Sequence, residues 1–132
     1  MIFTKAFVGS LAVFLVLDLL WLRVITRDYY PRQIGHLMAE NAQLGAAAVF
    51  YLVYLLGLVH LAVLPAVRGG GWSEAALSGA VLGLVAYGTY GFTNLAVLRE
   101  WPLAMTLVDT AWGVVLTGLA SLGGFWAAQW GR

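Results

Sequence analysis

The chain has 132 residues, of which 62% are hydrophobic and 10% are charged, and its mean hydropathy is +0.88. Soluble domains carry about 25% charged residues, so this composition excludes a water-soluble domain and predicts an all-α integral membrane protein. The net charge of +1 gives no electrostatic reason to expect nucleic acid as a partner, and the absence of cysteine excludes disulfides, thiolate metal sites and a cysteine nucleophile.

Four apolar segments are each long enough to cross a hydrocarbon core of about 30 Å at about 1.5 Å per residue. They cover residues 3–24, 43–66, 75–98 and 102–128. The first link is the longest, and its mixture of Arg, Tyr, Pro and His is typical of a segment in the membrane interface. The other links are short, which forces neighbouring helices to run antiparallel. We therefore expect a single domain, residues 1–132, folded as an antiparallel four-transmembrane-helix bundle with an interfacial link after helix one.

The first segment contains Asp18 within its apolar run, and Trp21 follows near the expected interface. Asp18 lies five residues before Arg23, which places it roughly 7–8 Å inside that interface. A charged Asp in the membrane core costs about 2.5–3.5 kcal/mol on insertion scales. Asp18 and Trp21 are therefore candidates for a polar site within the bundle.

The link after this segment contains His36 and Met38, and the second segment adds His60. These residue types are haem ligands in other proteins. However, the two histidines are expected near opposite faces of the membrane, so they cannot share one iron, and no second strong ligand is placed for either. We predict no metal site and no cofactor, with haem or another pigment as the alternative. His36 is expected over the mouth of the polar site.

The second segment, residues 43–66, offers Tyr51 and Tyr54. Their spacing fits core packing as well as the lining of a pocket.

The third segment contains the stretch YGTYGFTN, residues 87–94, which is polar for a transmembrane helix. Tyr87, Tyr90 and Asn94 share one helical face with Gly83. Gly79 and Gly83 continue this face as a small-xxx-small pair, which allows close contact with another helix. The pattern predicts a face that is polar at one end and closely packed at the other.

The fourth segment has a similar inward-facing stripe, with polar residues near its beginning and small residues farther along. Asp109 lies eight residues after Trp101, roughly 12 Å inside the interface, and Trp112 is expected beside it. The stripe consists of Thr106, Asp109, Gly113, Thr117 and Ala120.

Polar groups from three helices thus converge in one leaflet half, and we expect a pocket that opens toward the first link. The two aspartates are expected either to share protons, because like charges resist joint ionisation in a low dielectric, or to meet an arginine from the same end of the bundle. A purely structural role, in which Asp109 accepts hydrogen bonds that lock helix packing, is the alternative. The pocket-lining or ligand-binding candidates are Asp18, Trp21, His36, Tyr51, Tyr87, Tyr90, Asn94, Thr106, Asp109 and Trp112.

An even number of helices places both termini on one side of the membrane. The side of the first and third links carries four arginines, and the side of the termini carries Lys5, Arg68 and Arg132. This bias is small, and Lys5 beside the amino terminus favours termini in the cytoplasm.

The chain resembles a family of bacterial four-helix membrane proteins filed as domain of unknown function 2177. The resemblance covers essentially the whole chain and implies a bacterial cytoplasmic-membrane location. Members usually carry TYDLTN in the third helix, where this chain has Gly91 in place of the Asp. The family has no established activity, and its members are said to occur near fatty-acid-modifying genes, which hints at lipid metabolism. The motifs are LDLLWL (17–22), GHLMAE (35–40), FYLVY (50–54), YGTYGFTNLA (87–96) and WPLAMTLVDTAWG (101–113).

Three hypotheses follow for function. The first is a protein that binds or modifies a lipid-like molecule in the pocket, although no recognisable nucleophile, metal triad or phosphate loop names a reaction. The second is a small dual-topology transporter that dimerises through Gly79 and Gly83. The third is an accessory subunit whose pocket docks another membrane subunit or a lipid.

Overall fold

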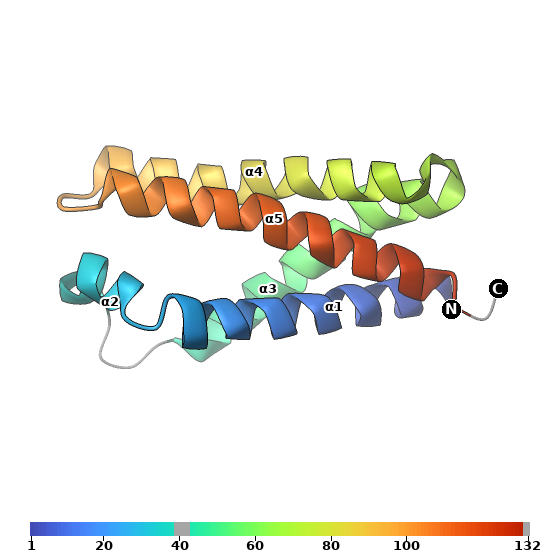
Figure 1. The fold of residues 1–132 in the computed structure, drawn as a ribbon, viewed down its shortest axis with the longest axis horizontal. Coiled ribbons are helices and arrows are strands. Elements are labelled where there is room, and N and C mark those ends of the chain that lie inside the picture. The colour runs from blue at the N-terminus through green and yellow to red at the C-terminus, as the bar shows by residue number, and fades with distance from the viewer. Residues whose placement is uncertain (39–42, 131–132) are drawn as a thin grey trace.

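The computed structural model describes residues 1–38 and 43–130, and within them the chain forms helices and turns without strands (Figure 1). The chain belongs to the class of all-helical proteins, as expected from its composition. Its elements are α1 (Ile2–Leu20), η1 (Trp21–Ile25), α2 (Tyr29–Ile34), η2 (Gly35–Leu37), α3 (Leu44–Leu58), η3 (Val59–Val63), η4 (Ala66–Gly70), α4 (Gly71–Val97) and α5 (Leu103–Ala128).

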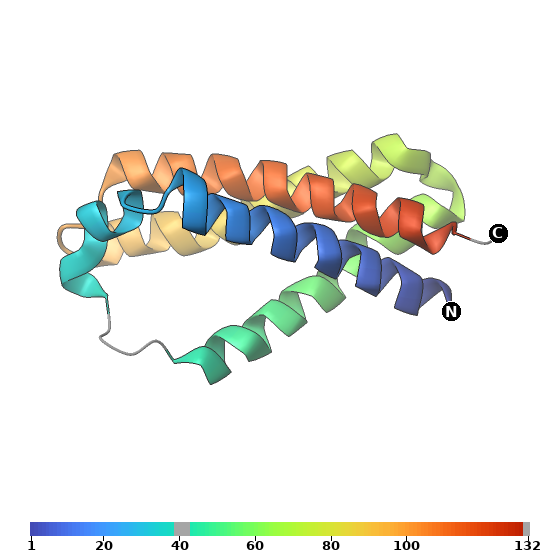
Figure 2. The ribbon, with the colours of Figure 1, turned by 60° about the horizontal axis from the view of Figure 1, so that its bottom comes forward.

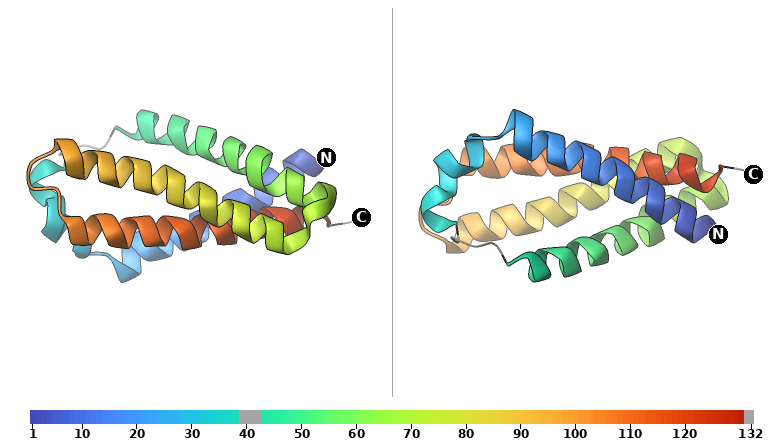
Figure 3. Two further views of the ribbon diagram at one scale, coloured as in Figure 1. Left: turned by 90° about the horizontal axis from the view of Figure 1, so that it is seen from above. Right: turned by 90° about the horizontal axis from the view of Figure 1, so that it is seen from below.

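Three helical stretches in the described residues are long and apolar enough to cross a membrane: Ile2–Ile25, Leu44–Val97 and Leu103–Ala128. The middle stretch has 54 residues, and a straight helix of that length would be about 80 Å long. It is not straight, because the chain reverses direction where α3 and its extension meet α4 (Figure 3). Gly69 has non-helical torsion angles there, and Gly71 has a φ of 78°, a conformation that glycine adopts without strain.

Helix α5 is the centre of the fold, because α1 and α4 both pack against it and both run antiparallel to it (Figures 1 and 2). Small residues permit this close packing. A Cβ on Gly79 of α4 would lie 2.8 Å from the carbonyl oxygen of Thr117, and one on Gly9 of α1 would lie 2.6 Å from that of Gly123. Ser10 of α1 also donates a hydrogen bond to the Ala120 carbonyl oxygen at 3.0 Å. Gly79 and Gly83 thus pack against α5 within the chain.

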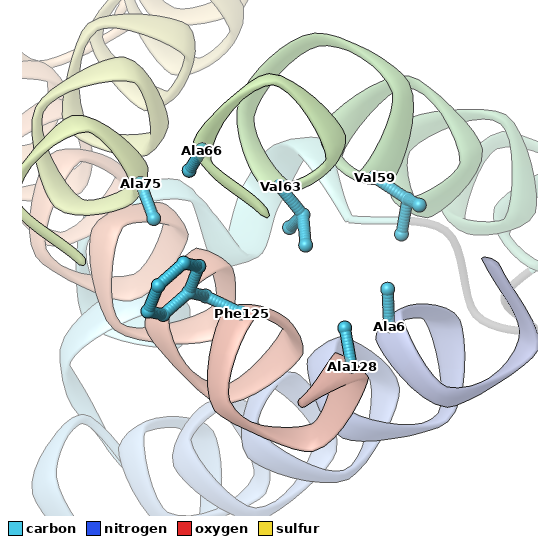
Figure 4. Packing of buried hydrophobic residues seen from close by; sticks show 7 residues of the cluster. All are labelled: Ala6, Val59, Val63, Ala66, Ala75, Phe125 and Ala128. Carbon is cyan, nitrogen blue, oxygen red and sulfur yellow. The ribbon is translucent and has the colours of Figure 1, made fainter. Parts of the chain in front are cut away.

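One of the two apolar clusters among the described residues lies toward the end of the bundle where the chain begins and ends (Figure 4). The amino-terminal end of α1 and the carboxyl-terminal end of α5 meet there, since Lys5 Nζ donates a hydrogen bond to the Trp130 carbonyl oxygen at 2.6 Å. The core cluster consists of Ala6, Val59, Val63, Ala66, Ala75, Phe125 and Ala128.

Helix α3 diverges from the other helices toward its amino-terminal end (Figure 2). Every residue from 43 to 53 is exposed, and the first buried residue of α3 is Leu55. The opposite end of this helix continues into η3, where Val59, Ala62 and Val63 are buried. Helix α3 is therefore anchored at one end only.

The helix boundaries differ from the expected ones where local turns intervene. The first helix continues into a π-helical turn, η1, and ends at Thr26. The amide and the hydroxyl of Thr26 both donate hydrogen bonds to the Trp21 carbonyl oxygen, at 2.8 and 2.7 Å. The helix expected to begin at residue 75 begins at Gly71. The end of the GHLMAE motif, residues 39–40, and Arg132 lie outside the described residues.

Candidate functional site

A cavity of about 340 Å³ lies between the helices on the side of the bundle opposite the termini. Binding pockets for small molecules typically have volumes of about 300–1,000 Å³. Residues from the carboxyl-terminal end of α1 and from η1, α2, α3, α4 and α5 contribute to it. The lining consists of Asp18, Trp21, Leu22, Tyr30, Phe50, Tyr51, Tyr54, Ala86, Tyr87, Tyr90, Asp109 and Trp112.

Tyr30 of α2 connects three elements across this cavity. Its hydroxyl donates to Asp109 Oδ1 at 2.9 Å and accepts a hydrogen bond from Trp21 Nε1 at 3.0 Å. Partial burial raises the pKa of the Tyr30 hydroxyl, and the hydrogen bond from Trp21 only partly offsets this effect. The hydroxyl therefore keeps its proton and remains a donor to Asp109.

Two tryptophans form one wall of the cavity. The rings of Trp21 and Trp112 stack with their centroids 4.3 Å apart and their planes within 5°. Trp112 Nε1 is buried, and no described residue satisfies it with a hydrogen bond. The stack joins η1 to α5 and fixes the orientation of the side chains on either side of it.

Tyrosines form the opposite wall. Tyr54 of α3 and Thr117 of α5 share a hydrogen bond of 2.5 Å, and Phe14 of α1 packs against both Tyr51 and Tyr54 at centroid distances of 5.4 and 5.3 Å. The ring of Tyr87 meets Tyr54 edge-on at 6.5 Å. These contacts hold α3 to the bundle at the depth of the cavity, since the residues of α3 that precede them are exposed.

The two carboxylates of the cavity, Asp18 and Asp109, have no Lys, Arg or His nitrogen within 4.0 Å among the described residues. Both side chains are partly buried. The arginines at this end of the bundle were expected to be able to neutralise them, but all four are exposed: Arg23, Arg27, Arg32 and Arg99.

Seven of the ten predicted site residues line this single cavity: Asp18, Trp21, Tyr51, Tyr87, Tyr90, Asp109 and Trp112. They come from α1, η1, α3, α4 and α5, so the geometric convergence expected from helical periodicity is present.

The other three predicted residues lie outside the cavity. His36 on η2 approaches Glu100 of the α4–α5 link, with Nε2 and Oε2 3.2 Å apart. The hydroxyl of Thr106 donates to the Pro102 carbonyl oxygen at 2.8 Å, which closes the first turn of α5. Asn94 is one turn beyond Tyr90, toward the end of α4, and does not reach the cavity.

Tyr30 lines the cavity but is absent from the residues predicted to form the site. Its pairing with Asp109 spans 79 positions of sequence, so helical periodicity could not reveal it. The spacing of Tyr54 fits both core packing and pocket lining, and in the structure Tyr54 packs against neighbouring helices and also lines the cavity. The sequence did not predict Leu22, Phe50 and Ala86 as lining residues, because apolar side chains are common throughout the chain.

Gly91 occupies the place where relatives are expected to carry Asp. It is buried, and a Cβ there would lie 3.1 Å from Thr106 Cγ2 and 3.8 Å from Thr110 Oγ1. The Thr110 hydroxyl is itself buried without a hydrogen-bond partner among the described residues. A side chain at position 91 would therefore face α5 beside these threonines instead of entering the cavity.

Helices this long and apolar, with two carboxyl groups placed in a cavity between them, are typical of a membrane protein. The model of the family described as predicted membrane protein (DUF2177) matches residues 3–126, so the chain belongs to this family. No curated protein and no solved structure matches the chain.

Proposed function

We propose that this membrane protein binds a lipid-like molecule, with the polar part of the molecule in the cavity and its hydrocarbon part among the surrounding lipids. The observation that carries the proposal is a largely aromatic cavity containing two carboxyl groups, whose lining continues onto the outer surface of the spanning helices. Phe50 is 71% exposed, Tyr90 56% and Tyr51 45%, although all three also line the cavity. An amphipathic molecule matches a site that combines two carboxyl groups with aromatic and aliphatic side chains.

The proposal includes four membrane crossings, formed by α1 with η1, α3 with η3, α4 and α5. The reversal at Gly69–Gly71 supports this count, because a bilayer core of about 30 Å cannot contain a helix of 54 residues. The cavity then lies in one leaflet half. We further propose a bacterial cytoplasmic membrane with both termini in the cytoplasm.

Labelling of single cysteines tests the topology, and the natural chain has no cysteine to interfere. An impermeant maleimide should label Ser73→Cys from the same side as Lys5→Cys, and Asp28→Cys from the opposite side. If Leu44–Val97 crossed only once, position 73 would lie inside the membrane and would resist labelling.

Native mass spectrometry in a mild detergent tests ligand binding. We expect a stoichiometric extra mass of lipid size on the chain, and its loss in Ala86→Trp, because an indole at this half-buried lining position would fill the cavity. Ala96→Trp is the matched control, since Ala96 is exposed on the same helix and outside the cavity.

Other outcomes would contradict the proposal. Bound mass that Ala86→Trp leaves unchanged would show that the ligand lies elsewhere. Extra mass from another polypeptide would favour an accessory subunit, and a dimer without ligand would favour a transporter.

A further inference from the structure

The cavity has two carboxyl side chains and no basic one among its lining residues. Asp18 and Asp109 both line it, and the rest of the lining is aromatic or aliphatic. Tyr30 supplies one hydrogen bond to Asp109, whereas a carboxylate offers about four lone-pair positions. The lining thus favours a ligand group that is positive, and it disfavours an anion.

The aromatic content of the lining points in the same direction. Eight of the twelve lining residues are aromatic, against 14% of the whole chain. A cation over the face of Trp or Tyr is attracted by the ring quadrupole, and aromatic cages recognise alkylammonium groups by this means. The stacked pair of Trp21 and Trp112 and the tyrosines opposite it present such rings from several helices.

We propose that the cavity binds an alkylammonium group, that is, a positively charged nitrogen attached to a hydrocarbon chain. Asp18 and Asp109 supply the counter-charge, and the aromatic rings surround the methyl or methylene groups on the nitrogen. The hydrocarbon chain of the ligand leaves the cavity past Phe50 and Tyr51, which are exposed on α3. This inference rests on the proposed function and specifies the chemistry of its ligand. The same group occurs in amine-bearing lipid headgroups and in free amphipathic amines.

Two headgroups on the same dodecyl chain test the charge requirement with the unaltered protein. Dodecyltrimethylammonium carries a fixed positive charge, whereas dodecyl-dimethylamine oxide is neutral at neutral pH and has nearly the same shape. Binding is measured by tryptophan fluorescence in neutral maltoside micelles. We expect the ammonium compound to bind at least about tenfold more tightly, as cation–π contacts with desolvated charge imply.

Substitution of the carboxylates tests their role. Asp109→Asn should reduce ammonium affinity about tenfold and leave amine-oxide affinity nearly unchanged. The Asn oxygen can still accept the hydrogen bond from Tyr30, so the fold is retained, and Asp18→Asn provides a second, independent variant. Asp28→Asn is the matched control, because Asp28 is exposed in the link and outside the cavity.

A competition experiment distinguishes the two sources of the ammonium group. Displacement of the probe by phosphatidylethanolamine or phosphatidylcholine, but not by phosphatidylglycerol, would identify a lipid headgroup. Displacement only by single-chain amines would identify a free amphipathic amine. Either result supports the proposal.

Equal binding of the ammonium and the amine oxide would overturn the inference about charge. If Ala86→Trp still abolished that binding, the lipid-binding function would stand with a neutral ligand. If Ala86→Trp changed the binding of neither probe, the cavity would not be the binding site and the proposed function would fail as well.

Discussion

Replacement of Gly79 by alanine should separate α4 from α5. A Cβ at this position would lie 2.6 Å from Ser121 Cβ, 2.8 Å from the Thr117 carbonyl oxygen and 3.1 Å from Gly118 Cα. Ordinary contacts of a Cβ begin at 3.4 Å, so the helices must move apart by about 0.8 Å or distort. Overpacking of this kind typically costs about 1–3 kcal/mol. Two of the three atoms nearest to the new methyl belong to the backbone of α5, which has little freedom to yield.

Gly57→Ala is the matched control for this prediction. Gly57 lies in α3, and a Cβ there would meet no atom within 4 Å. The same added methyl should therefore change the free energy of unfolding by less than about 0.5 kcal/mol. Both variants can be unfolded reversibly in mixed micelles with increasing dodecyl sulfate and followed by circular dichroism. If Gly79→Ala proved as stable as Gly57→Ala, the close packing of α4 on α5 would be refuted.

Three further predictions concern individual side-chain contacts. Tyr30→Phe removes the donor to Asp109 and should cost about 1–3 kcal/mol of unfolding free energy; in a double-mutant cycle with Asp109→Leu, which cannot accept a hydrogen bond, the two effects should be non-additive, and simple additivity would argue against the hydrogen bond. Tyr54→Phe should cost about 0.5–1.5 kcal/mol through loss of the bond to Thr117, and it should have little further effect in a Thr117→Val background, as measured by the same unfolding assay. His36→Ala should change stability by less than about 1 kcal/mol, because both His36 and Glu100 are exposed; a larger loss would mean that this pair anchors the link.

Helical periodicity was sufficient to predict much of the site. The faces of α4 and α5 follow from spacings of three and four residues, so the convergence of Tyr87, Tyr90 and Asp109 could be derived without a structure. The depth of each side chain below the membrane interface could also be predicted, because each residue of a helix advances by about 1.5 Å. The same estimate of depth predicted that Asp18 lies in the same cavity, as it does.

Contacts that depend on the path of the links could not be derived in this way. Tyr30 is brought to Asp109 by the fold of α2, and no periodic pattern in a six-residue helix encodes where that helix docks. His36 was expected over the pocket, but η2 directs it to Glu100. Thr106 shares the helical face of Asp109, yet its hydroxyl is used by its own backbone at Pro102, a local competition that is common for threonine.

The one-sided anchoring of α3 has a consequence for how a ligand would enter. The residues of α3 before Tyr54 bury no side chain in the bundle, whereas the η3 end is held by Val59, Ala62 and Val63. A swing of α3 about η3 would widen the mouth of the cavity at the expense of the ring contacts of Tyr51 and Tyr54, the packing of Leu55 and one hydrogen bond, while the core cluster near the termini and the glycine contacts of α5 stayed intact. Exchange of a molecule with the bilayer would thus be limited by these few contacts of α3 and by displaced lipid, and it would not require the protein to unfold.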